Sequence, residues 1–362
     1  MSGLRVVRAA GDPHTRGVTI GHELRDLIER SLDFYHSYFA RRGVTSPQLS
    51  DLLTPYMVAA EKSTPDLMAL ITGMSEGALV PFMELFAVNA FEELEAQLEP
   101  VGDTRLFLDK KSGKTERCTS FAVTGDGFTL LGHNEQWLTG DMGNVAIVVE
   151  LPGEGHTAVA SPTYACCIPA VGINSHGIAM GIQSLSASDD GVGVPRVLVS
   201  RHTLASPDKT DVLRRSALSG RAGGYGYSVA IRGGDTFTVE TSATRQTVIE
   251  GNGSHTNHYV TEELAPVATE ASLYSRSRYN RVVELVAAKP PSTPEEAMAI
   301  LADHNSTPAS ICNHPDLAEG EEAESVVFSM VCEVESGRMW VADGLPCSAP
   351  FEEIDLTDVI KN

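Results

Sequence analysis

The sequence predicts an α+β layered fold, because helical and strand patterns occur in separate groups along the chain. The first third is mainly helical, whereas most of the predicted strands follow residue 118. A chain of 362 residues with 42% hydrophobic content is long enough to bury a large core. We find no repeat of fixed period and no low-complexity tract.

The elements of the first third are predicted from apolar stripes and from helix caps. Serine or threonine followed by proline marks a cap residue before the first helical position, and this signal occurs twice. In order, we expect a strand at residues 4–8 and helices across residues 20–39, from Ser46, from Thr64 and across about residues 81–96. We expect the acidic patch of the last helix, which includes Glu92 and Glu93, to be a solvated face.

After residue 118, short apolar runs separated by glycine-rich turns predict strands, with helices between them. The strands are expected at residues 145–151, 157–161, 178–185, 227–231, 236–241, 247–250, 326–334 and 338–342. Helices are expected from about Pro195, behind a cap at Thr210, across residues 275–287, and from the capping box that begins at Thr293.

Cys118 stands at the head of the clearest hairpin in the sequence. Residues 118–123 and 128–137 alternate in polarity around Gly125-Asp126-Gly127, which is a strong hairpin signal. A free cysteine in a strand is usually a small buried hydrophobe. This one, however, follows a polar, lysine-rich loop at residues 109–116, so it is also placed to become a new N-terminus when the bond before it breaks.

A cysteine in that position can supply both nucleophile and base. Its thiol attacks the carbonyl of Arg117, the acyl group shifts from nitrogen to sulfur, and hydrolysis cuts the chain into residues 1–117 and 118–362. The freed α-amine, with a pKa of roughly 8, then activates the sulfur directly or through one water. On the residues alone, the structural and the catalytic interpretations of Cys118 both stay open.

The hairpin sequence resembles the start of the mature chain in the acyl-coenzyme A:6-aminopenicillanic acid acyltransferase family. This family comprises self-processing N-terminal-nucleophile hydrolases with a catalytic cysteine, and the insect β-alanyl-dopamine hydrolase is a relative. The resemblance covers nearly the whole chain. Its motifs are Cys118-Thr119-Ser120-Phe121, Gly125-Asp126-Gly127, Leu131-Gly132-His133-Asn134-Glu135-Gln136-Trp137, Val171-Gly172-Ile173-Asn174, Thr256-Asn257-His258-Tyr259, Ser310-Ile311-Cys312-Asn313 and Met339-Trp340-Val341-Ala342-Asp343-Gly344.

The resemblance implies a four-layer αββα sandwich in which Cys118 opens a central strand. Residues 1–117 and 118–362 would form one compact domain, as a heterodimer of the two fragments after cleavage. Asn257 matches the position of a side-chain oxyanion donor. The alternative for Asn257 is a turn cap after Gly251-Asn252-Gly253, where asparagine is common.

The chain departs from the family pattern at two positions. The family generally has an acidic residue at the position of Gln136, next to the amine of the nucleophile. Glu135 could compensate, but strand alternation predicts that it points to the opposite face. Asn313 stands where the family often has a basic residue, which puts the substrate in doubt.

Several further residues are candidates for binding the substrate or supporting the site. Trp137 is either core or a wall of the pocket, and Arg278 is either a substrate contact or, with Arg281, a surface partner of acids. The supporting candidates are Asn134, Glu135, Gln136, Trp137, Asn174 and Arg278.

The composition and net charge limit which partners and cofactors we expect. A formal net charge of −21 without a lysine or arginine cluster argues against nucleic acid and anionic membranes. The six cysteines show no C-x-x-C pair, and the histidines show no metalloprotease signature, so we expect neither a disulfide framework nor a metal or cofactor. Without an apolar segment near Met1, we expect a cytoplasmic protein.

The leading functional hypothesis is therefore an autoprocessing amidase that cleaves a linear amide of a small N-acyl substrate through a Cys118 thioester. One alternative is acyl transfer to an amine, because the same covalent intermediate serves both reactions. The other is a non-enzymatic scaffold that kept the fold, which the departures at Gln136 and Asn313 would favour.

Overall fold

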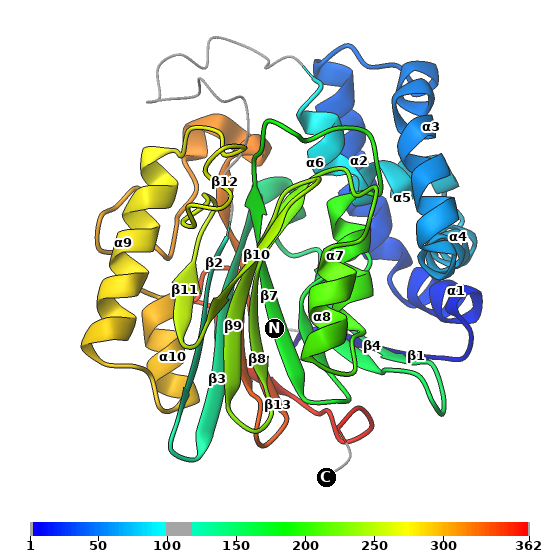
Figure 1. Ribbon diagram of the computed structural model, residues 1–362. Coiled ribbons are helices and arrows are strands. Elements are labelled where there is room, and N and C mark those ends of the chain that lie inside the picture. The colour runs from blue at the N-terminus through cyan, green and yellow to red at the C-terminus, as the bar shows by residue number, and fades with distance from the viewer. Residues whose placement is uncertain (1–2, 99–117, 361–362) are drawn as a thin grey trace.

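Two β-sheets pack face to face in this protein, and helices cover their outer faces. A computed structural model describes residues 3–98 and 118–360, and its layers are visible in Figure 1. Helices α9 and α10 lie on one side of the two sheets, and α7, α8 and the N-terminal helices lie on the other. The predicted α+β class and its four-layer αββα form are thereby confirmed.

The first sheet has six antiparallel strands and carries the Cys118 hairpin near its centre. Its strand order is β11-β2-β3-β12-β13-β14. The strands are β2 (Thr119–Gly125), β3 (Phe128–Leu138), β11 (Gly253–His255), β12 (Glu324–Glu333), β13 (Arg338–Asp343) and β14 (Glu352–Ile354). Helices α9 (Leu273–Ala288) and α10 (Pro294–Leu301) cover its outer face through an apolar cluster that includes Phe121, Val282 and Ile300.

The second sheet has eight strands in the order β1-β4-β5-β6-β7-β8-β9-β10. They are β1 (Arg5–Ala10), β4 (Val145–Leu151), β5 (Val159–Tyr164), β6 (Gly172–Asn174), β7 (Ile178–Leu185), β8 (Gly224–Ile231), β9 (Asp235–Thr241) and β10 (Gln246–Glu250). The edge strand β1 pairs in parallel with β4, whereas the other neighbours are antiparallel. Helices α7 (Arg196–Leu204) and α8 (Lys209–Ser216) flank this sheet.

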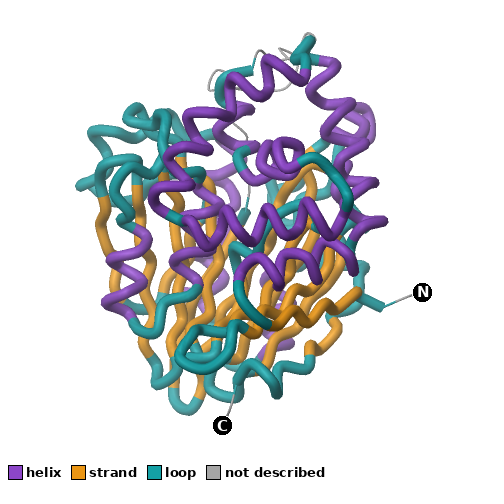
Figure 2. Tube along the Cα trace, turned by 90° about the vertical axis from the view of Figure 1, so that its right-hand side faces the viewer, coloured by secondary structure: helices purple, strands orange, loops and turns teal. Residues whose placement is uncertain are grey.

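Helices form most of the N-terminal third. Figure 2 shows these helices lying across the strands, on the side of the molecule that faces the viewer. They are α1 (Pro13–Glu23), α2 (Arg25–Arg41), α3 (Ser46–Ser63), α4 (Pro65–Ala78), α5 (Phe82–Asn89) and α6 (Phe91–Glu95). The single helix predicted across residues 20–39 is two helices, because Leu24 leaves helical geometry with φ −107° and ψ 11°. The helix predicted across residues 81–96 is likewise divided at Ala90.

Glycines allow α1 to cross α4 at very short range. A Cβ atom on Gly17 would lie 2.1 Å from the carbonyl oxygen of Leu70, and one on Gly73 would lie 2.1 Å from that of His14. Since no side chain fits such a gap, the two helix backbones are in direct contact. This contact fixes the first helix, which follows β1, against the rest of the helical layer.

The differences from the sequence predictions lie in short elements and caps. Strands β6, β11 and β14 have three residues each and were not predicted. Helix α8 is capped by Asp208 rather than Thr210. Arg117 and the loop at residues 109–116 lie outside the described residues. Within residues 3–98 and 118–360, no helix combines the length and apolarity that a membrane span requires.

Candidate active site

Cys118 immediately precedes the central strand β2. The register of the hairpin pairs Thr119 with Asn134 on β3. Cys118 itself has a φ of 91°, in the left-handed region that non-glycine residues rarely adopt, so the backbone turns sharply where the strand begins. Its side chain is buried and belongs to the wall of a cavity.

The cavity is mainly apolar and encloses about 610 Å³, including the part that opens to solvent. It receives side chains from both sheets, from α6 and from α7. Its apolar wall includes Phe91, Trp137, Ile168, Ile182 and Phe328, and its polar side chains are Glu92, Glu135, Thr163, Tyr164, Ser184 and Tyr225. A recess with a mainly apolar wall and a few convergent polar groups is typical of a site for a small organic molecule.

Glu135 and His133 share the space beside the Cys118 sulfur. One ligand atom of each of the three residues lies within 4.8 Å of the others. The Glu135 carboxylate contacts His133 Nε2 at 2.9 Å and accepts a hydrogen bond of 2.7 Å from the Tyr164 hydroxyl. The expectation that Glu135 points away from Cys118 is therefore wrong.

Strand alternation explains this arrangement once the facing layers are known. On β3, Asn134 and Gln136 point toward α10 and both donate to the carbonyl of Ile311, at 3.0 and 3.3 Å. Glu135 lies between them and points into the space between the sheets, where the cavity is. The backbone N–H of Gln136 contacts the Cys118 sulfur.

The pKa of the Cys118 thiol is raised well above its usual value. Burial is the main cause, and the nearby charge of Glu135 adds to it, while the Gln136 N–H has the opposite effect. The sulfur is thus held as a neutral thiol. A base is needed before it can act as a nucleophile.

Arg278 links Cys118 to Asn257. Its buried guanidinium donates to the Cys118 carbonyl, to the Thr119 hydroxyl at 2.9 Å and to Asn257 Oδ1 at 2.9 Å. Because a guanidinium only donates, it fixes the oxygen of the Asn257 amide toward itself and turns the NH₂ group the other way. That group donates to the carbonyl of Ser184, a residue of the cavity wall, at 3.2 Å.

Arg278 and Arg281 of α9 thus have different uses. Arg281 pairs with Asp303 and Glu284, as predicted for a surface residue. The same prediction for Arg278 is wrong, because its side chain points inward, toward the head of β2.

The other predicted supporting residues fall into two groups. Trp137 lines the cavity, stacks on Tyr164 with ring centres 5.3 Å apart and donates to the Tyr35 hydroxyl. Asn134 and Asn174 lie outside the cavity wall and bond buried backbone groups: Asn134 donates to Leu301 and Ile311, and Asn174 donates to Leu204 and Ser206. The Asn313 side chain donates to the carbonyl of Glu324.

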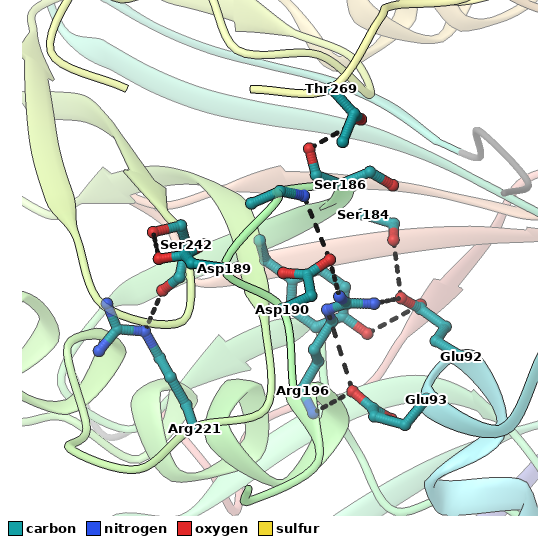
Figure 3. A network of polar contacts seen from close by, with 12 residues as sticks. Glu92, Glu93, Ser184, Ser186, Asp189, Asp190, Arg196, Arg221, Ser242 and Thr269 are labelled. Atoms are coloured by element: carbon teal, nitrogen blue, oxygen red, sulfur yellow. Dashed lines mark hydrogen bonds and ion pairs between the residues drawn. The ribbon is translucent and has the colours of Figure 1, made fainter. Parts of the chain in front are cut away.

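A network of ionic and polar contacts surrounds Arg196 (Figure 3), and two of its members, Glu92 and Ser184, line the cavity. Glu92 accepts hydrogen bonds from Tyr225 at 2.9 Å and Ser184 at 2.7 Å, and it pairs with Arg196 at 3.2 Å. Arg196 also pairs with Asp190 at 2.9 Å. The expectation of a solvated face for Glu92 and Glu93 is wrong, because Arg196 of α7 holds both carboxylates against the second sheet.

Burial raises the pKa of Glu93 to about 7, although Arg196 opposes the shift. A carboxyl group whose folded pKa exceeds its unfolded one stabilises the fold below the unfolded value, and this contribution is lost as pH rises through 7. We therefore expect Glu93→Gln to gain thermal stability relative to the natural chain between pH 5 and pH 8, by about 2–4 °C. Melting curves at the two pH values measure this gain. Glu61→Gln, at an exposed site on α3, is the control and should show no such gain.

Sequence reasoning missed three participants in the site: His133, Tyr164 and Arg196. His133 carried a usable signal, because it stands two residues before Glu135 and thus on the same face of β3. Tyr164 and Arg196 come from β5 and from the start of α7. Tyr164 lines the cavity, and Arg196 pairs with Glu92 of its wall. Both positions depend on the packing of the second sheet and its helices, which no local sequence pattern encodes.

Two facing sheets between helical layers form the αββα fold of the N-terminal-nucleophile hydrolase type, and Cys118 stands at the head of a central strand beside a cavity. The chain belongs to the acyl-coenzyme A:6-aminopenicillanic acid acyl-transferase family, whose sequence profile matches residues 123–346. Membership supports an enzyme that acts on amide or acyl groups, as a hydrolase or as an acyltransferase.

Solved structures similar to this chain have low sequence identity to it. A variant of conjugated bile acid hydrolase from Clostridium perfringens is 13% identical, with a TM-score of 0.45 over 67% of this chain and 93% of that one. Penicillin V acylase from Agrobacterium tumefaciens is also 13% identical, with a TM-score of 0.41 over 66% of this chain and 86% of that one. None of the curated proteins compared with the chain matches it in sequence.

Proposed function

We propose that the chain is an autoprocessing amidohydrolase that cleaves a linear amide bond through an acyl-thioester on Cys118. The observation that carries the proposal is the position of the Cys118 sulfur on the cavity wall, within 4.8 Å of a carboxylate and an imidazole. A thiol on the wall of a binding space can be reached by a bound substrate, whereas one sealed among apolar groups cannot.

The first step is cleavage of the chain itself. The Cys118 thiol attacks the carbonyl carbon of Arg117, the carbon–nitrogen bond between the two residues breaks, and the amine leaves with the proton of the thiol. Water then hydrolyses the thioester, which leaves a carboxylate on Arg117 and a free thiol and amine on Cys118. Support comes from Arg278, whose contacts with the Cys118 carbonyl and the Thr119 hydroxyl fix the backbone beside that bond.

The second step is activation of the sulfur. Before cleavage the nitrogen of Cys118 is an amide and cannot accept a proton, and the pKa of the thiol is raised by burial. After cleavage the α-amine, with a pKa of about 8, lies on the same residue as the thiol and serves as its base. The Glu135 carboxylate, close to the sulfur, would stabilise the ammonium that results.

The third step is amide cleavage in the cavity. The thiolate adds to the acyl carbon, the tetrahedral oxyanion collapses, and the amine departs with the proton held by the α-amine. Water hydrolyses the acyl-thioester and frees the acid. The NH₂ group of Asn257, oriented by Arg278, is the proposed oxyanion donor, and a donor of this kind typically contributes about 10²–10³ in rate.

The lining of the cavity points to the kind of amide. Its aromatic and aliphatic wall suits an apolar group, and the network around Glu92 offers hydrogen-bond partners at one end. We therefore propose a small N-acyl substrate with one apolar part. Acyl transfer to an amine instead of water uses the same thioester and remains the second candidate within this chemistry.

Intact-mass analysis of the purified chain, combined with product analysis, tests the function. We expect two fragments that separate between Arg117 and Cys118, and release of acid and amine from an N-acyl amide. If addition of an acceptor amine diverts the acyl group to a new amide, the chain is an acyltransferase. A single uncleaved chain that also resists a thiol-directed acylating probe would leave only a scaffold that kept the fold.

A further inference from the structure

We propose that His304, Cys312, His314 and Cys347 form a structural zinc site that joins two loops of the first sheet. One ligand atom of each of the four residues lies within 4.8 Å of the others. None of the four belongs to the cavity wall beside Cys118. The site is independent of the proposed function, because it uses no residue of the candidate active site.

The distances match those around a tetrahedral zinc ion. Zinc bonds of about 2.0–2.1 Å to nitrogen and 2.3 Å to sulfur place the ligand atoms about 3.3–3.8 Å apart. Here His304 Nε2 lies 3.0 Å from His314 Nε2, and His314 Nε2 lies 3.4 Å from the Cys347 sulfur. Adjustments of a few tenths of an ångström would bring these two distances to the zinc geometry, and the other pairs of ligand atoms lie within 4.8 Å of one another.

The donor set is also that of structural zinc sites. Two thiols and two imidazoles form a closed Cys₂His₂ set, which fills all four positions and leaves none for a substrate. His314 Nε2 lies close to both His304 Nε2 and the Cys347 sulfur. These three side chains are exposed, so a cation can reach them from solvent. Cys312 lies beneath them and is buried.

Neighbouring hydrogen bonds hold the ligands in place. The backbone N–H of Cys312 donates to the carbonyl of Asp303 at 3.0 Å, and the Ser310 hydroxyl donates to the carbonyl of Cys312 at 2.7 Å. The backbone of Cys347 approaches the Cys312 sulfur as a donor. Such outer contacts orient metal ligands before the ion binds.

Zinc binding would fix the conformation of a loop that contacts β3. Residues 302–323 follow α10 and contain, as regular structure, the short 3₁₀ helix η3 (Leu317–Glu322), and Cys347 belongs to the loop between β13 and β14. Ile311, next to Cys312, receives the hydrogen bonds of Asn134 and Gln136 on the strand that carries Glu135. A bound zinc would thus fix the loop that supports the outer face of β3.

No sequence pattern predicts this site. The four residues have the spacing H-x₇-C-x-H-x₃₂-C, which differs from the zinc patterns with short paired spacings, and for this reason we expected no metal. The hairpin of β12 and β13 brings Cys347 back to the loop that holds the other three.

Zinc binding by the reduced, metal-free full chain tests the proposal. Equilibrium dialysis with elemental analysis should find one tightly held zinc per chain, and Co²⁺ in its place should give the absorption of a tetrahedral thiolate site. His304→Asn and Cys347→Ser should each weaken zinc binding at least tenfold. Both positions are exposed, so the variants should fold, which circular dichroism checks.

Two control variants show whether zinc binds at this site or at other cysteines and histidines of the chain. Cys118→Ala removes the cluster beside the cavity and should still bind one zinc, and His22→Asn, at an exposed histidine on α1, should bind as the natural chain does. The proposal fails if the reduced chain holds no stoichiometric zinc, or if His304→Asn and Cys347→Ser bind it unchanged. It also fails if zinc binding is lost with Cys118→Ala alone.

Discussion

Replacing Cys118 with alanine should abolish both cleavage of the chain and turnover of an N-acyl amide. Without the sulfur, neither the acyl shift at Arg117 nor the substrate thioester can form, and loss of a catalytic nucleophile costs on the order of 10⁶ in kcat. Intact mass should show one uncleaved chain. The fold should persist, because the alanine keeps the buried apolar position at the head of β2.

Cys332→Ala is the matched control for this experiment. Cys332 is also buried in the first sheet, on β12, but it does not belong to the cavity wall. We expect this variant to cleave itself and turn over the substrate at near-natural rates. Full activity of Cys118→Ala, or equal losses in both variants, would contradict the assignment of Cys118 as the nucleophile.

The second large effect is expected at Arg278, as a positioning residue. In Arg278→Lys the charge remains, but one ammonium group cannot contact the Cys118 carbonyl, the Thr119 hydroxyl and Asn257 Oδ1 with the planar geometry of a guanidinium. The Asn257 amide then loses its fixed orientation. We expect kcat to fall by about 10²–10³, with KM changed much less, because the affected contact acts mainly on the transition state.

Arg281→Lys provides the control on the same helix. Arg281 pairs at the surface with Asp303 and Glu284, so its replacement should leave kcat within about twofold. Measured on the cleaved chain, a double variant of Arg278→Lys with Asn257→Ala should lose little more kcat than Asn257→Ala alone, since both act through one amide in substrate turnover. Additive losses in the double variant would show that Arg278 does not work through Asn257.

Most of the architecture could be predicted from the sequence because its elements carry local signals. Strands β4 and β7 begin and end at the predicted residues, and α3 and α10 begin beside their predicted caps. What could not be predicted was how helices are interrupted, as at Leu24, and which strands are only three residues long. Both depend on packing against distant segments and not on the local pattern.

The candidate site was predicted less completely, and the errors have one physical origin. Glu135 was placed on the wrong side of β3, because alternation separates the two faces of a strand without telling which face looks into the cavity. Glu92 was expected at the surface, and a surface ion pair was one of the two alternatives for Arg278, because charged residues usually lie there. Their burial depends on partners from other layers, Arg196 for Glu92 and Asn257 for Arg278.

The pairing of β1 with β4 bears on the fate of the N-terminal piece if the chain is cut before Cys118. Residues 5–10 are hydrogen-bonded along their length to a strand of the larger piece, and Asn89 bonds backbone groups of Cys166 and Ile168. Cleavage would then give an N-terminal fragment that stays bound and does not dissociate. Its dissociation would remove the edge strand β1 from the second sheet and expose the buried core. Maturation in such a molecule changes the chemistry of a single residue and leaves the architecture whole.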